Sequence, residues 1–176
     1  PPGPYTTSIN VQIDGNSLSL KRLEAHSVGW KLSAQGQWID APSPVDVFSF
    51  QKSKLPGQVN LEGSVSISDL NWLAQEVTGI RRLSGGLEVH GTLRGPITAP
   101  TANATIKLSD AELFPDFDMP ALGNLNMETS VTPEVISVHK FSGVLGGAPF
   151  DLAGTFKNMT GPDSEVDFKL QGENIL

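Results

Sequence analysis

The residue types that most often carry enzymatic or metal chemistry are few in this sequence, and they are not grouped. The three histidines, His26, His90 and His139, do not have the spacing of metal ligands, and no His-Glu pair occurs in a helical frame. Cysteine is absent, which excludes disulfides, thiolate metal sites and cysteine nucleophiles. We therefore expect no metal site, and we expect each histidine at the surface or at a strand edge.

Two further patterns resemble catalytic motifs only in part. Asp116 and Asp118 have the composition of a glycosidase carboxylate pair, but acids in a proline-flanked loop are usually solvated. The glycine-rich run 143–147 is followed by neither a Lys-Ser/Thr pair nor a helix, so it does not predict a phosphate-binding loop. The sequence predicts no catalytic residue and no cofactor, and we expect a protein that is not an enzyme.

The charge balance also limits the partners. The chain has 12 Lys and Arg against 19 Asp and Glu, for a net charge of −7. A nucleic-acid surface needs clustered basic residues, but only Lys21-Arg22 and Arg81-Arg82 are adjacent here. An acidic surface also suits anionic lipid headgroups poorly. We expect no nucleic acid, and we expect any lipid contact to involve acyl chains.

Alternating apolar and polar residues run through most of the chain. Ile9, Val11 and Ile13 show this two-residue period, and comparable runs recur to the end of the sequence. The chain also has 18 Gly and 13 Pro, which interrupt it at short intervals. The pattern predicts an all-β, mainly antiparallel fold of about a dozen strands of roughly five residues each.

Two segments depart from the alternation. Residues 68–78 predict one short helix, with Ser68 or Asp69 as its N-cap and Gly79 after its end. Residues 109–123 contain two prolines and four acids, and they predict a long loop or a partly irregular strand. No run has the length of a membrane-spanning helix and the start does not resemble a signal peptide, so we expect a segment excised from a longer chain.

An internal repeat is the most informative feature of the sequence. At an offset of 118 residues, Leu20 matches Val138, and the apolar positions of residues 9–50 match those of residues 127–168 without a gap. Gly36 and Gly154 match as well. We expect one domain over residues 1–176, built from two copies of a strand meander that stack to bury an apolar face.

The sequence predicts only one short helix, so no layer of helices is expected to cover that apolar face. A second sheet, closure into a barrel, and a sheet curled around an apolar interior are the three solutions that remain. Gly36 and Gly154 would permit sharp curvature, or they would mark simple bulges. A large apolar surface without cover indicates a binding site or an interface.

The run from Leu83 to Pro100, continued to Ala111, resembles a repeat of the TamB/AsmA-like family, Gly-x-Leu-x-Val-x-Gly-Thr-Leu-x-Gly-Pro followed by a further strand. The stretch 144–155 resembles a second hallmark of that family. The resemblance is clearest over residues 57–156. It implies a curved β-taco sheet with an apolar concave groove. It also implies a periplasmic location in the bacterial cell envelope, within a parent protein anchored in the inner membrane.

The function that we expect is a hydrophobic groove for phospholipid transport between the inner and outer membranes. The resemblance also implies an alternative, a scaffold of the translocation and assembly module for outer-membrane proteins such as autotransporters. Its partners would be a BamA-like outer-membrane barrel and unfolded outer-membrane protein strands. A carbohydrate-binding sandwich is a third possibility, although few aromatic residues are available for it. The residues expected to contact acyl chains are Leu20, Leu32, Leu61, Ile106, Val138, Phe150 and Leu152.

Overall fold

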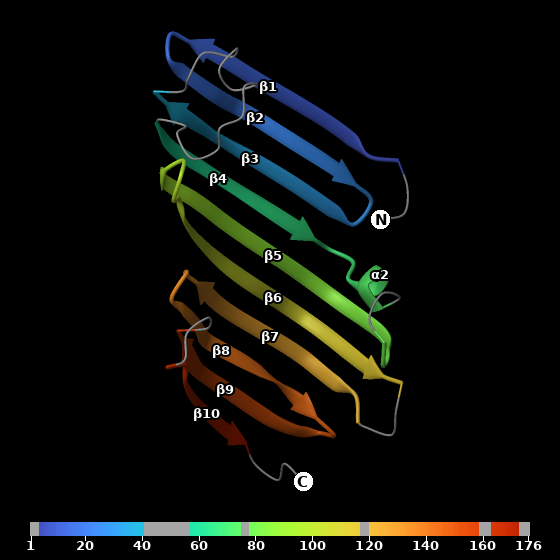
Figure 1. Cartoon of the computed structure of the whole chain (residues 1–176). Coiled ribbons are helices and arrows are strands. Elements are labelled where there is room, and N and C mark those ends of the chain that lie inside the picture. The colour runs from blue at the N-terminus through green and yellow to red at the C-terminus, as the bar shows by residue number, and fades with distance from the viewer. Residues whose placement is uncertain (1–3, 41–56, 75–77, 117–119, 159–162, 173–176) are drawn as a thin grey trace.

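The chain forms one antiparallel sheet in which every strand pairs with its sequence neighbours (Figure 1). The computed structural model describes residues 4–40, 57–74, 78–116, 120–158 and 163–172. One short helix, α2, spans Asn71–Ala74. The strands in the described ranges are β1 (Thr6–Asp14), β2 (Ser17–Ser27), β3 (Trp30–Ile39), β4 (Gln58–Ile67), β5 (Ile80–Pro96), β6 (Thr101–Pro115), β7 (Leu122–Val131), β8 (Val135–Leu145), β9 (Ala148–Lys157) and β10 (Glu165–Gly172).

This architecture confirms the predicted all-β fold of a curved, mainly antiparallel sheet. The predicted strand length of about five residues was wrong, because the ten described strands have between 8 and 17 residues. Register shifts lie within several of these long strands. An inserted residue shifts the phase of the alternation, and a pattern with a shifted phase resembles two strands.

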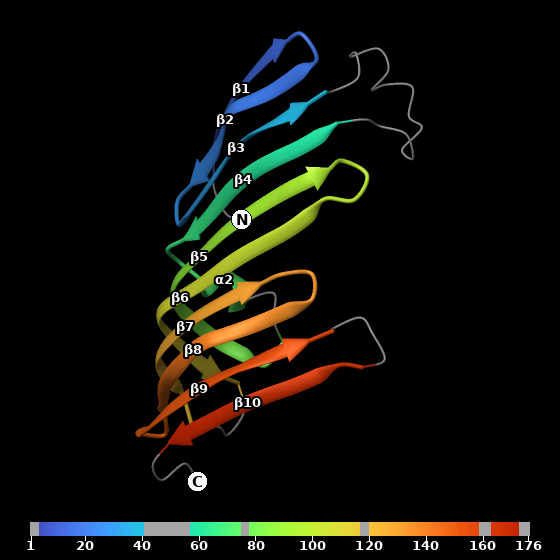
Figure 2. The same ribbon diagram turned by 90° about the vertical axis from the view of Figure 1, so that its left-hand side faces the viewer.

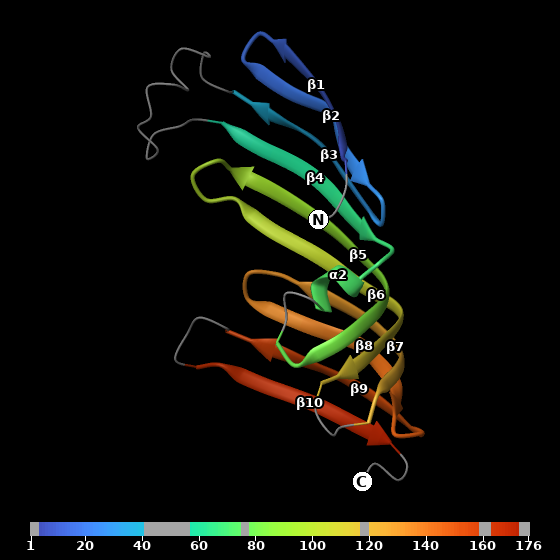
Figure 3. The same ribbon diagram turned by 90° about the vertical axis from the view of Figure 1, so that its right-hand side faces the viewer.

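A line of bulges crosses the middle of the sheet. Gly85, Asp110 and Asn124 have positive φ values of 111°, 48° and 50°, and each lies at a register shift between neighbouring strands. Bulges bend a strand and increase its local twist. β5 and β6 are sharply bent, and Figures 2 and 3 show α2 inside this bend. We call the line of these three residues the crease.

The helix is shorter than the predicted 68–78. α2 covers Asn71–Ala74, and residues 75–77 lie outside the described ranges. The predicted cap is present, because Asp69 Oδ1 accepts a hydrogen bond of 2.9 Å from the backbone N–H of Asn71. Leu70, directly before α2, is only 2% exposed. The helix itself packs against β5.

Of the two alternatives predicted for residues 109–123, the irregular strand is the one that the structure supports. β6 continues to Pro115 and β7 begins at Leu122, so the segment is mostly strand. Leu113 stands opposite Leu83 on β5 and opposite Leu122 on β7. Pro115 ends the strand, where a missing amide donor is tolerated. Pairing with two neighbouring strands outweighs the local propensity of a segment with two prolines and four acids.

The strand pairing has the same register in both repeat copies. Val11 pairs with Leu20, and Thr129, at the offset of 118, pairs with Val138. Each copy then has a bulge at the matching place, with Lys21-Arg22 in β2 and His139-Lys140 in β8. We therefore describe β1–β4 and β7–β10 as equivalent four-strand units.

The end of the repeat differs from the sequence alignment. Phe48 and Phe50, which the offset matches to Val166 and Phe168, lie outside the described residues. Gly154 stands opposite Phe168, whereas its counterpart Gly36 stands opposite Leu61. By register, the counterpart of Phe168 is therefore Leu61. The connection from β3 to β4 is longer than that from β9 to β10.

Candidate functional site

One face of the sheet carries apolar side chains on all ten strands. Residues that stand directly opposite one another on neighbouring strands point to the same face. One such row crosses β3 to β8 through Leu32, Val65, Val89, Ile106, Thr129 and Val138. A parallel row crosses β3 to β10 through Trp30, Ile67, Leu87, Leu108, Met127, Phe141, Leu152 and Leu170. We call this side of the sheet the apolar face.

All seven residues expected to form the groove lie on the apolar face. Leu20, Gly36 and Leu61 are successive partners in one row, while Leu32, Ile106 and Val138 share another. Leu152 stands opposite Phe141, and Phe150, two residues earlier on β9, points to the same side. The structure therefore places them on one surface, spread over six strands.

The apolar face is crowded at the crease. A buried cluster there contains Ala111, Leu125 and Phe150, with Phe141 packed against it. The Phe141 and Phe150 rings meet edge to face, with centroids 5.4 Å apart. On a bent sheet the inner side is the crowded side, so the apolar face lines the inside of the bend. This cluster is the core of the described part of the chain.

Away from the crease the apolar face remains open. Leu20, Leu32, Ile106 and Val138 are only half-buried, and the described chain provides no second sheet in contact with them. The whole chain exposes 11,731 Å², whereas a compact folded monomer of its mass would expose about 8,300 Å². The chain thus exposes more surface than a compact monomer of its mass would.

A row of small residues makes a hollow in the apolar face. Ala34, Gly63, Gly91 and Ala104 stand directly opposite one another on β3 to β6. The hollow has a volume of about 690 Å³, within the range of ligand sites. Its sides are formed mainly by aliphatic residues and prolines, Leu61, Leu93, Pro100, Ala102, Val131 and Pro133, and its lining also includes Glu62, Thr92, Asn103 and Thr132. An apolar chain laid here would approach the backbone of the sheet.

Two polar atoms are buried without a hydrogen-bond partner in the described part of the structure. One is Trp30 Nε1 and the other is Thr129 Oγ1. Thr129 is 5% exposed and lies between Ile106 and Val138 in a row of aliphatic residues. The sequence analysis did not identify Thr129. The repeat offers a signal, because its counterpart is Val11, which is apolar.

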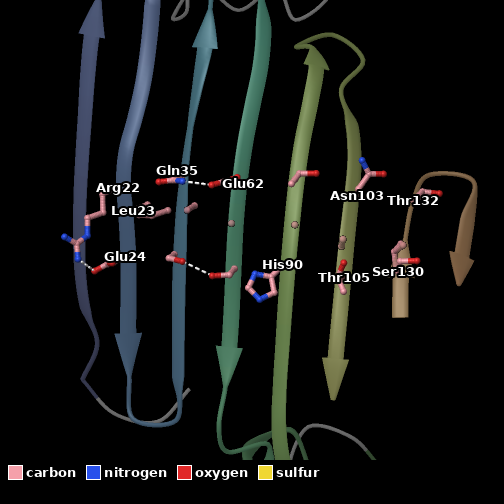
Figure 4. A pocket seen from close by; sticks show the side chains of 18 of the residues that line it. Arg22, Leu23, Glu24, Gln35, Glu62, His90, Asn103, Thr105, Ser130 and Thr132 are labelled. Carbon is pink, nitrogen blue, oxygen red and sulfur yellow. Dashed lines mark hydrogen bonds and ion pairs between the residues drawn. The ribbon is translucent and has the colours of Figure 1, made fainter. Parts of the chain in front are cut away.

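The opposite face of the same strands is polar (Figure 4). The Ser33 and Ser64 hydroxyls lie 2.8 Å apart, and Gln35 Nε2 donates a hydrogen bond to Glu62. In the next row, Glu88, Lys107, Glu128 and Lys140 alternate in charge across four strands. Opposite charges at facing positions stabilise strand pairing.

The polar face has a hollow of about 830 Å³, behind the same small residues. Arg22 and Glu24 form an ion pair of 2.6 Å at its side, and the Arg22 guanidinium holds the pKa of the Glu24 carboxyl below its ordinary value. The other lining groups are mainly hydroxyls, amides and His90. The described residues include no group of three or more side chains that could hold a metal ion.

The arrangement can bind apolar ligands, and the order of the strands explains why. Each strand places alternate residues on the apolar face, and continuous pairing keeps the rows in register across the sheet.

Within the described ranges, no helix is long and apolar enough to cross a membrane. No family model, curated protein or solved structure matches this chain.

Proposed function

We propose that this chain is the segment of a TamB/AsmA-like envelope protein that offers acyl chains of phospholipids a path between the inner and outer membranes. The observation that supports this function is the apolar face, which continues across ten strands and is half-exposed over most of its area. Exposed apolar surfaces of this extent mark interaction sites. The proposed location in the cell envelope is based on the resemblance of residues 83–111 to the family repeat.

The face suits hydrocarbon better than a headgroup. Its rows contain aliphatic, aromatic and small residues, and the charged rows lie on the opposite face. A hydrocarbon chain beside such rows meets mainly apolar side chains, so it covers few groups that need a hydrogen-bond partner. The row of small residues from Ala34 to Ala104 provides depth, while Leu61 and Leu93 form a wall beside it. Transfer along this surface requires no chemical step.

Photocrosslinking tests the proposal. A photoreactive residue at Ile106, incubated with vesicles of phosphatidylethanolamine and phosphatidylglycerol, should become linked to phospholipid. The control is the same residue at Thr105, which is exposed on the polar face one position away. Equal labelling at both positions, or labelling at neither, would contradict the groove.

Charge substitutions provide a second test. Ile106→Asp and Leu152→Asp place a carboxylate in the apolar rows, and both should block envelope function at normal protein levels. The assembly-scaffold alternative predicts a different outcome for the crosslinking experiment, in which photoreactive residues at exposed strand edges capture a client polypeptide. Normal envelope integrity with both variants would exclude the lipid path.

A further inference from the structure

The strands of the sheet do not all have the same extent. β4 ends at Ile67, which pairs with Leu87 of β5. β5 continues beyond this pair to Ile80, so residues 80–86 have no partner on β4. The crease crosses this extension and the neighbouring parts of β6 and β7. We call the parts of β5–β9 beyond the row of Leu87 the folded wall.

The segment 68–74, which includes α2, lies at the start of the folded wall. The helix packs against β5, inside the bend (Figures 2 and 3). Leu70 and Ala74 are 2% and 8% exposed. Leu70 is the largest fully buried side chain of the described residues, and it does not belong to the buried cluster of Ala111. The segment therefore fills an apolar space of its own inside the bend.

The attachment of this segment to the sheet is slight. Before α2, the backbone N–H of Ser68 donates a hydrogen bond of 2.8 Å to the carbonyl of Gly29. After it, the carbonyl of Gly79 accepts a hydrogen bond of 3.0 Å from the backbone N–H of Asp116. A helix of four residues does not hold its conformation by itself in water. The position of the segment thus depends on the burial of apolar side chains, a contribution that is non-directional.

A hydrocarbon chain can make the same kind of contact as Leu70. The apolar rows continue on both sides of the crease, because Leu87 stands opposite Leu108 before it and Leu83 stands opposite Leu113 beyond it. An acyl chain in the place of α2 would therefore meet aliphatic side chains in both directions.

We propose that the place of Leu70 and α2 is a second acyl-chain site, which the segment 68–74 closes as a displaceable plug. This inference rests on the proposed function. An acyl chain that moves from the open part of the apolar face into the folded wall displaces the segment, and the segment returns when the chain has passed. Leu70 and the hydrocarbon compete for one apolar space.

A reversible disulfide tests the plug. A Cβ atom added at Gly29 would lie 3.4 Å from Asp69 Cβ, close to the separation of about 3.8 Å in disulfides. The chain has no cysteine, so Gly29→Cys combined with Asp69→Cys gives one disulfide, which locks the segment when oxidised and releases it when reduced. The two states are the same protein, so strain at position 29 and the lost Asp69 cap affect both.

Phospholipid labelling is measured at two positions, with vesicles of phosphatidylethanolamine and phosphatidylglycerol. A photoreactive residue at Leu83 reports on the folded wall, and one at Ile106 reports on the open part. We expect oxidation to lower labelling at Leu83 at least roughly tenfold and to leave labelling at Ile106 unchanged. Equal labelling at Leu83 in both states overturns the plug, while labelling at Ile106 still supports the proposed function. No labelling at Ile106 overturns the proposed function, and this inference with it.

Leu70→Ala gives a second test that needs no disulfide. The smaller side chain weakens the hold of the segment, so labelling at Leu83 should rise at least roughly threefold, with no rise at Ile106. Val59→Ala, at a position that is 5% exposed on β4 and outside the folded wall, is the matched control for a lost core contact. Unchanged labelling at Leu83 with Leu70→Ala, or the same rise with Val59→Ala, overturns the plug.

Discussion

The side chain of Asn126 accepts a hydrogen bond from the backbone N–H of Asp110, with 3.2 Å between Oδ1 and N. Its Nδ2 donates to the backbone carbonyl of Asn124 at 3.0 Å. Asp110 and Asn124 are the crease residues of β6 and β7, so one side chain joins two neighbouring bulges. We infer that Asn126 holds the angle of the bend.

Asn126→Ala removes both hydrogen bonds, and we expect it to lower the free energy of unfolding by about 1–2 kcal/mol. Urea unfolding followed by circular dichroism measures this change. Asn124→Gly is the control, because glycine adopts a positive φ without strain, and we expect a change within about 0.5 kcal/mol. A larger effect at Asn124 than at Asn126 would contradict the role of the side chain.

Gly36 and Gly154 occupy matching positions where the neighbouring strand approaches closely. A Cβ atom added at Gly36 would lie 2.7 Å from Leu61 Cα, and one at Gly154 would lie 2.7 Å from Phe168 Cα. Gly36→Ala and Gly154→Ala should each destabilise the fold by about 1–3 kcal/mol, because the backbone must move. Gly123→Ala meets nothing within 4 Å and should be nearly neutral in the same urea experiment.

Gly91→Leu should fill the hollow in the apolar face without disturbing the strand. An added Cβ at Gly91 has its nearest neighbour, Asn103 O, 3.8 Å away. We expect phospholipid crosslinking at Ile106 to fall roughly tenfold, equivalent to about 1.4 kcal/mol of binding. Gly86→Leu adds the same side chain to the same strand outside the lining of that hollow, and unchanged crosslinking there is the required comparison.

Thr129→Val should stabilise the protein by about 1 kcal/mol, because it replaces a buried hydroxyl that has no partner by a methyl group of similar size. Ser130→Ala, one position along, removes a hydroxyl that lies 2.9 Å from His139 Nε2, and it should be neutral or destabilising. Thermal unfolding of the two variants compares them directly. A destabilised Thr129→Val variant would indicate a polar partner for the hydroxyl.

The sequence by itself determined which residues share a face. A strand alternates its side chains with a period of two, so Leu20, Leu32 and Ile106 could be assigned to one apolar surface before any pairing was known. The repeat offset also gave the matching of Val11 with Thr129, since both copies need the same strand order. The absence of cysteine and the scattered histidines needed no structure.

The tertiary structure decided where the sheet bends and what remains uncovered. Asp110 and Asn124 adopt positive φ without being glycine, and Asn126 joins them across two strands, so no local pattern identifies the crease. The same cause decided between the two alternatives for residues 109–115, because pairing with β5 and β7 outweighs local propensity and favours the irregular strand over the loop. Whether the apolar face is covered likewise depends on which distant segments come into contact. The alternation of residues within a single strand does not contain that information.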